Sequence, residues 1–142
     1  MTDMEGLEPL IGEWSTEVRH PDIGVVHGEM SIEWMDGGGY LIQRASAEDT
    51  RFPRGISLIG PTEDRDRIVQ HYFDSRGVAR VYEISLENGV WRTWRDDPEF
   101  SQRFTGRFSD DGSAIEVALE RTEPDGTWVH DFDLTYRRKG QR

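Results

Sequence analysis

The sequence predicts an all-β protein: a single antiparallel up-and-down β-barrel of about ten strands with a short N-terminal helix. Apolar and polar side chains alternate over most of the chain, as they do in strands with one buried face. Turn residues separate the alternating stretches, and no helical pattern lies between them. Aromatic residues make up 11% of a chain that is only 35% hydrophobic, which suits a sheet with one solvated face. The length of 142 residues corresponds to one domain, 1–142.

The segment from Asp3 to Leu10 is the one stretch with helix-like spacing of apolar residues, at Leu7, Leu10 and Ile11. Asp3 is suited to cap its N-terminus, and Pro9 keeps the helix short. We expect a lid helix that packs on the sheet.

A period of two follows and continues to the end of the chain. The turn Asn88-Gly89 is the strongest hairpin signal, because a type I′ turn needs positive φ at both central residues. A meander of this many strands is expected to close and remove its edges. A β-sandwich is the alternative, although it usually needs long crossovers that the sequence does not show. The expected strands cover residues 14–18, 26–34, 40–47, 55–59, 67–74, 78–86, 90–95, 100–108, 113–121 and 128–138.

Composition excludes several classes of function. The net charge of −11 and the pI near 4.7 argue against nucleic acid and against anionic membrane surfaces as partners. The absence of cysteine excludes disulfides, thiolate catalysis and cysteine metal sites. The first residues lack the basic and then apolar pattern of a signal peptide, and no stretch approaches membrane-spanning length. We therefore expect a cytoplasmic protein.

The last expected strand raises the main functional question. Strict alternation places Trp128, His130, Phe132, Leu134 and Tyr136 on one face, so a single imidazole is predicted among aromatic and aliphatic side chains. His130 could ligate a metal or haem, act as a general acid or base, or be a core histidine that is hydrogen-bonded to a neighbouring strand. These alternatives stay open at this point.

Other polar residues are also expected on the inner faces, where a small closed barrel can hold a ligand. A buried guanidinium or imidazole must be paired with another group, with water or with a ligand. Arg121 could be a solvated rim charge or an anchor for a ligand carboxylate. Besides His130 and Arg121, the candidates are Thr16 and Gln102 and, on strands that alternate less regularly, Arg44, Gln70 or His71, Arg80, Tyr82 and Arg92.

Familiar catalytic and metal-binding motifs are missing. The sequence has no G-x-S-x-G elbow, no P-loop and no dinucleotide fingerprint. It has no H-E-x-x-H motif, and His27 and Glu29 share a face that is expected to be solvated. We expect no metal site unless His130 ligates haem.

Three short motifs resemble the calycin superfamily, in its nitrobindin-like and lipocalin-like branches. Leu10-Ile11-Gly12-Glu13-Trp14 resembles the L-x-G-x-W opening of the first strand, and Asp36-Gly37-Gly38-Gly39-Tyr40-Leu41 resembles the glycine turn that enters the third strand. The segment 128–138 resembles the closing strand that ends in an arginine. The resemblance implies a ten-stranded barrel. In nitrobindin-like proteins it also implies that a histidine on the final strand ligates a haem that binds nitric oxide or isomerises peroxynitrite, a role that His130 could take here.

The leading hypothesis is a barrel that binds a small, largely apolar molecule without a cofactor. The alternatives are haem binding through His130, a cofactor-free isomerase or cyclase with His130 as acid or base, and a domain without a pocket. A homodimer stays open as a further partner. The expected ligand-binding residues are Trp14, Met30, Trp34, Gln102, Phe104, Arg121, His130, Phe132 and Leu134.

Overall fold

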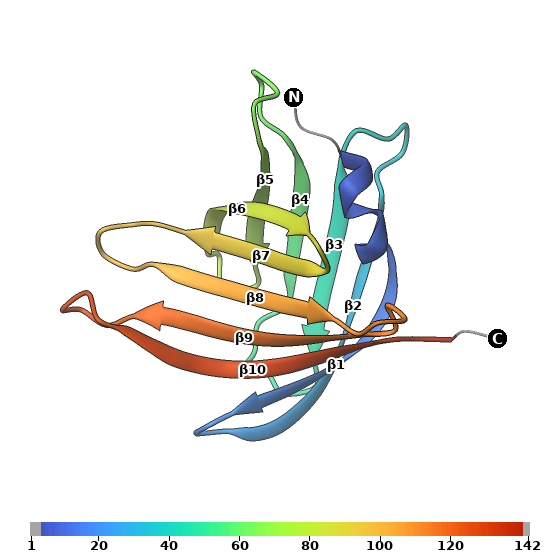
Figure 1. Ribbon diagram of the computed structural model, residues 1–142. Coiled ribbons are helices and arrows are strands. Elements are labelled where there is room, and N and C mark those ends of the chain that lie inside the picture. The colour runs from blue at the N-terminus through green and yellow to red at the C-terminus, as the bar shows by residue number, and fades with distance from the viewer. Residues whose placement is uncertain (1–3, 141–142) are drawn as a thin grey trace.

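The computed structural model describes residues 4–140 and shows a closed barrel of ten antiparallel strands (Figure 1). Every strand pairs with its neighbours in sequence, and β10 pairs with β1 to close the barrel. The predicted up-and-down barrel is therefore confirmed, and the sandwich alternative is wrong. The strands are β1 (Gly12–His20), β2 (Gly24–Trp34), β3 (Leu41–Ala47), β4 (Gly55–Pro61), β5 (Ile68–Asp74), β6 (Ala79–Glu87), β7 (Val90–Arg95), β8 (Gln102–Phe108), β9 (Ala114–Thr122) and β10 (Trp128–Arg138).

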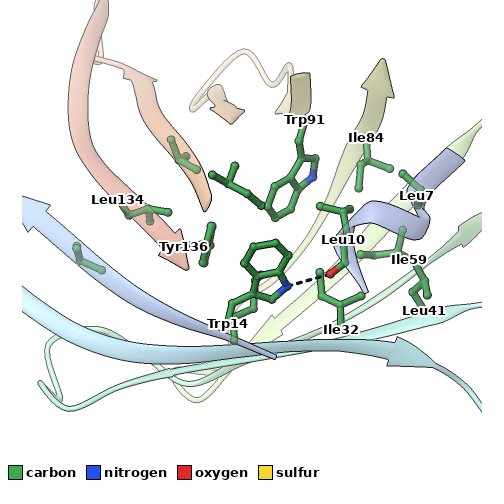
Figure 2. Close-up of a cluster of buried hydrophobic side chains, with 14 of the residues drawn as sticks. Leu7, Leu10, Trp14, Ile32, Leu41, Ile59, Ile84, Trp91, Leu134 and Tyr136 are labelled. Carbon is green, nitrogen blue, oxygen red and sulfur yellow. Dashed lines mark hydrogen bonds between the residues drawn. The ribbon is translucent and has the colours of Figure 1, made fainter. Parts of the chain in front are cut away.

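The predicted N-terminal helix is present as a short 3-10 helix, η1 (Met4–Leu10). The proposed cap, Asp3, lies outside the described residues. Leu7 and Leu10 point from η1 into one end of the barrel and are buried there (Figure 2). The helix also contacts β6, on the far side of the barrel from β1 in strand order. It therefore plugs this end, which we call the helix half. No helix among residues 4–140 is long and apolar enough to cross a membrane.

Trp14 lies at the centre of the helix half. Its indole Nε1 donates a hydrogen bond to the carbonyl oxygen of Leu10 at 3.0 Å (Figure 2). Its ring meets Phe108 edge to face, with 6.4 Å between centroids. Burial of large apolar groups is the main favourable term in folding, so this cluster is a major source of stability. Its fully buried members are Leu10, Trp14, Ile32, Leu41, Ile59, Trp91 and Ile115.

Arg138, at the end of β10, connects the last strand to the segment before the first. Its guanidinium donates to the carbonyl oxygens of Ile11 at 2.7 Å and Pro9 at 2.8 Å, and lies over the Trp14 ring, 4.1 Å from the centroid. Gly12 has a φ of 141°, and a Cβ there would lie 2.7 Å from Arg138 Nη1. A side chain at this position would therefore displace the guanidinium. The glycine and tryptophan of the first motif and the arginine of the last thus form one contact.

The glycine turn before β3 has a comparable role. Tyr40 follows the turn and donates from its hydroxyl to the carbonyl oxygen of Pro61 at 3.0 Å. Its ring lies on Gly60, where a Cβ would come within 2.3 Å of the ring carbons. The aromatic residue of the second motif thus covers β4 at the same end of the barrel.

The face predicted for His130 is wrong, because a β-bulge interrupts β10. His130 pairs with Glu120 and Phe132 pairs with Leu119, so one extra residue, Asp131, lies between them. An extra residue moves all side chains on one side of it to the opposite face. Phe132, Leu134 and Tyr136 face the interior as predicted, whereas Trp128 and His130 face outward.

The surroundings of His130 agree with this outer position. The imidazole side chain is 52% exposed, and its Nε2 lies 2.9 Å from the Asp133 carboxylate. The Arg103 guanidinium lies over the Trp128 ring, 3.6 Å from the ring centroid.

We expect Arg138→Ala to lower the free energy of unfolding by about 2 kcal/mol, because two hydrogen bonds from a charged group to carbonyl oxygens are lost. Arg137→Ala is the matched control. Arg137 is the preceding residue on the same strand and is exposed, so a change of less than about 0.5 kcal/mol is expected. Urea unfolding followed by tryptophan fluorescence measures both variants. Equal effects of the two substitutions would contradict the structural role of Arg138.

Candidate functional site

The interior changes from aliphatic to polar along the barrel. On β5 the inward side chains run from Ile68 at the helix half to Gln70 and Tyr72. On β6 they run from Ile84 to Tyr82 and Arg80. We call the part of the interior beyond Ile68 and Ile84, away from η1, the polar half. Polar side chains inside a domain need hydrogen-bond partners. A ligand in the polar half could supply such partners, so this half is where we look for a site.

The polar half contains a cavity of about 140 Å³. A dry cavity of about 150 Å³ in another protein binds benzene, so the space here corresponds to one six-membered ring. Arg103 contributes to the wall, but its guanidinium lies on Trp128 at the outer face. The lining residues are Gln70, Tyr72, Tyr82, Thr93, Gln102, Arg103, Phe104 and Leu119.

Gln70 is one of two buried polar residues of the lining, with 9% exposure, beside Thr93 with 8%. Its Nε2 donates to Ser57 Oγ at 3.0 Å and to Gln43 Oε1 at 3.1 Å. Its Oε1 has no hydrogen-bond partner among residues 4–140. Such a buried acceptor costs on the order of 1–3 kcal/mol relative to a satisfied one. Trp91 Nε1 is also buried without a partner in the described part of the chain, but Trp91 does not border the cavity.

Gln102 is oriented by donors from β6. Tyr82 donates its hydroxyl proton to Gln102 Oε1 at 2.6 Å, and Arg80 Nη1 lies 3.5 Å from the same oxygen. Arg80 also lies over the Phe100 ring, 5.3 Å from its centroid. The Nε2 group of Gln102 donates to no other group among residues 4–140. The amide therefore presents two free N–H donors.

Tyr72 and Asp74 form a third polar contact at this end. The Tyr72 hydroxyl donates to Asp74 Oδ2 at 2.6 Å, and Arg76 Nη2 contacts the same oxygen at 2.7 Å. The hydrogen bonds from Arg76 and Tyr72 hold the pKa of the Asp74 carboxyl well below its usual value, although burial opposes this. Burial and the hydrogen bond to Asp74 raise the pKa of Tyr72 well above its usual value. Tyr72 is thus a neutral phenol whose hydroxyl donates its hydrogen bond to Asp74.

Several residues predicted for the site lie elsewhere. Gln102 and Phe104 do line the cavity. Trp14, Met30 and Leu134 are instead packed in the core, and Trp34 is partly buried against it. The prediction that these four form cavity walls is therefore corrected.

Arg121 and Phe132 face the interior close to the cavity. Arg121 lies opposite Gln102 on the neighbouring strand and pairs with Glu123 at 3.0 Å and Asp131 at 3.5 Å. It is thus a compensated charge, in agreement with the rim alternative. Phe132 contacts the rings of His20 and Phe52, at 5.5 and 6.1 Å between centroids. These three rings form a separate cluster beside the turn between β1 and β2.

The haem expectation depended on an inward His130, and the structure places this residue on the outer face. A cavity for one six-membered ring is also too small for a macrocycle of four pyrrole rings. The residues present do not fit haem in this cavity, and the same orientation removes His130 as an acid or base there. No group of three or more His, Asp or Glu side chains that could hold a metal ion occurs in the described part of the chain.

Sequence reasoning missed four lining residues, Tyr72, Thr93, Arg103 and Leu119, and left β5 ambiguous. Of the less certain candidates, Gln70, Arg80 and Tyr82 face the interior, whereas Arg44, His71 and Arg92 face outward. The ambiguity arises because both faces of β4 to β6 carry apolar residues, so alternation gives no contrast. The exposed apolar residues on the outer face are Ile56, Leu58, Phe73 and Val81.

A wider hollow of about 680 Å³ lies on the outer surface beside this apolar face. Arg44, Arg54, Ile56 and Phe73 are among its lining residues, and all four are exposed. Small-molecule sites bury most of the ligand surface, which an open hollow of exposed side chains does not do. The interior cavity is therefore the better candidate.

Comparisons with known proteins support the fold alone. No protein-family model matches the chain, and no curated protein matches it significantly. Among solved structures, the crystal structure of Rv2717c from M. tuberculosis is similar, with a TM-score of 0.64 and 15% identity over 96% of this chain and 97% of that one. A de novo designed fluorescence-activating β-barrel has a TM-score of 0.48 and 15% identity, covering 98% and 100% of the two chains. A redesigned β-barrel has a TM-score of 0.44 and 12% identity, with the same coverage. The chain thus has a β-barrel fold that is compatible with ligand binding.

We expect Asp74→Asn to destabilise the protein by about 2 kcal/mol at pH 7, because the charged acceptor of the Tyr72 and Arg76 hydrogen bonds is lost. The pKa of Asp74 is lower in the folded than in the unfolded state. Its contribution is therefore fully present above the unfolded pKa of about 3.9 and is lost as the pH falls.

Denaturant unfolding at several pH values between about 7 and 2.5 measures this effect. The difference between the wild type and Asp74→Asn should shrink toward the acid end. Asp110→Asn, at an exposed turn position, is the control and should follow the wild type throughout. A difference for Asp74→Asn that stays constant with pH would refute the assigned role of the carboxylate.

Proposed function

We propose that this protein binds a small molecule in the cavity of the polar half. The observation that carries the proposal is the composition of the cavity wall, where two glutamines, two tyrosines and a threonine meet Phe104 and Leu119. Ligand sites typically combine apolar and aromatic walls with a few placed polar groups. The helix half is packed with apolar side chains, whereas the polar half contains the cavity, and this difference supports a binding site in the polar half.

Stability alone does not account for these polar residues. Apolar side chains of similar volume would fill the same space without desolvating amide groups, and replacements of this kind are often neutral or stabilising. The buried Gln70 acceptor, without a partner among the described residues, is a further cost that stability does not explain. Proteins commonly accept such costs at functional sites.

Two parts of the earlier hypothesis change in this proposal. The ligand is smaller than the molecule expected from the sequence, because the cavity corresponds to one six-membered ring, and it meets a mostly apolar wall that also carries a few hydrogen-bonding groups. Haem and acid–base catalysis through His130 are not part of it, since His130 lies outside the cavity. Membership of the calycin superfamily remains a proposal, supported by the barrel and by the contact between the first and last motifs.

The test is a titration of the ¹⁵N-labelled protein with the one-ring probes benzene, phenol and 2-pyridone. We expect saturable shifts of the amide signals of Gln70, Thr93 and Gln102 with at least one probe. Leu119→Trp, which fills the cavity, should abolish the shifts. Val81→Trp, at an outward position that is 53% exposed, should leave them unchanged.

Thermal unfolding of both variants verifies that they fold. The wild-type titration decides the matter if Leu119→Trp does not fold. The proposal fails if no probe gives a saturable shift, or if the shifts persist in a folded Leu119→Trp variant.

A further inference from the structure

Arg80, Arg95 and Arg121 lie on inner faces at the end of the barrel away from η1, and they differ in their partners. Arg95 forms an ion pair with a nearby carboxylate at 3.2 Å, and Arg121 forms two, at 3.0 and 3.5 Å. Arg80 forms none with the described residues. Acidic residues outnumber basic ones by 28 to 17 in this chain, so carboxylates are not scarce. The lack of a counter-charge at Arg80 is therefore a specific feature of this position.

The Arg80 guanidinium is held by two neutral side chains. Its Nη1 lies 3.5 Å from Gln102 Oε1, and its central carbon lies 5.3 Å from the centroid of the Phe100 ring. A guanidinium has five N–H donors and the contact to Gln102 is long, so most of these donors have no acceptor among residues 4–140. Arg80 is half-buried, and a charge in such a place needs water or an anion as its partner.

Gln102 connects Arg80 to the cavity. The amide that contacts the guanidinium belongs to a lining residue. Tyr82, two positions after Arg80 on the same inner face of β6, also lines the cavity and donates to the same amide oxygen at 2.6 Å. These contacts reach from β6 across β7 to β8, which run side by side (Figure 1). Arg80 thus lies at the margin of the cavity, next to its wall.

The cavity itself suits the uncharged part of a ligand. Phe104, Leu119 and the rings of Tyr72 and Tyr82, which meet edge to face at 6.1 Å, supply apolar and aromatic surfaces. The volume of about 140 Å³ corresponds to one six-membered ring. A ring in this space would have its charged substituent at the margin, where Arg80 lies.

We infer that the ligand is a small aromatic carboxylate, whose ring occupies the cavity and whose carboxylate pairs with Arg80. The inference rests on the proposed function and names the class of molecule that the same site takes. A guanidinium and a carboxylate match in a bidentate, charge-assisted pair. One guanidinium balances one negative charge, so a carboxylate fits better than a doubly charged phosphate.

The carboxylates nearby do not compete for Arg80. Asp97 is held by Arg95, and Glu123 and Asp131 are both held by Arg121. The net charge of −11 acts on a ligand mainly over longer distances, and physiological salt screens it beyond about 8 Å. The short-range pair with Arg80 therefore decides the affinity for an anion here.

The experiment compares benzoate, benzamide and benzene by NMR titration of the ¹⁵N-labelled wild-type protein. Benzoate and benzamide have the same shape, and only benzoate is charged. We expect benzoate to bind about tenfold or more tightly than benzamide, because hydrogen bonds to an ionised group are about twice as strong as neutral ones. The Arg80 Nε–H signal should shift with benzoate and not with benzene.

Two variants with the same change of net charge locate the contact. Arg80→Met keeps a long unbranched side chain and removes the guanidinium, so it should weaken benzoate about tenfold or more and leave benzene within about twofold. Arg92→Met is the control, because Arg92 is an exposed arginine on the outer face of β7. It should leave the affinity for benzoate unchanged.

The outcomes separate the inference from the proposed function. If benzene binds but benzoate binds no more tightly than benzamide, the inference is overturned and the proposed function stands. Absence of binding for every probe overturns both. The inference also fails if a folded Arg80→Met variant binds benzoate as tightly as the wild type, or loses benzoate and benzene equally. If this variant does not fold, the wild-type affinities and the Arg80 Nε–H signal decide.

Discussion

The contact between Arg138, Trp14 and the backbone of Pro9 and Ile11 is the interaction on which the rest of the structure depends. A ten-stranded meander becomes a barrel only when its last strand pairs with its first, and that pairing joins residues more than a hundred positions apart. Loop closure over such a distance costs entropy, so contacts at the seam must offset it. Arg138 does this at the end of the seam where η1 enters the barrel. It also supplies donors for carbonyl groups that a short helix leaves free at its end.

Closure and plugging at one end explain how the other half can be polar. Leu7 and Leu10 complete a core in which Trp14 and Trp91 are fully buried, and this core supplies the apolar burial that a domain of this size needs. The polar half is then free to carry groups that do not maximise stability, including the unpartnered oxygen of Gln70. The boundary between the helix half and the polar half crosses the strands. On β5, for example, Ile68 and Gln70 are neighbours on the inner face, yet Ile68 lies in the helix half and Gln70 in the polar half.

The sequence alone sufficed for the fold because the barrel depends on alternation and turns, which are local patterns. The strand order, the closure and the short helix were all predicted correctly. The candidate site was predicted only in part. Gln102 and Phe104 lie on β8, which alternates regularly, whereas Tyr72 lies on a strand with apolar residues on both faces. His130 was misplaced because nothing local in a polar strand end distinguishes a bulge from a regular ladder.

The bulge has a chemical consequence for the interior. Regular pairing would have placed the His130 imidazole near the cavity, but the extra residue instead brings the Asp131 carboxylate to within 3.5 Å of Arg121. Arg121 lies directly opposite Gln102 on β9, so its charge would otherwise stand uncompensated beside the cavity and attract anions. With Asp131 and Glu123 as partners, Arg121 is neutralised at the rim. The irregularity in β10 thus compensates a charge that would otherwise face the interior beside Gln102.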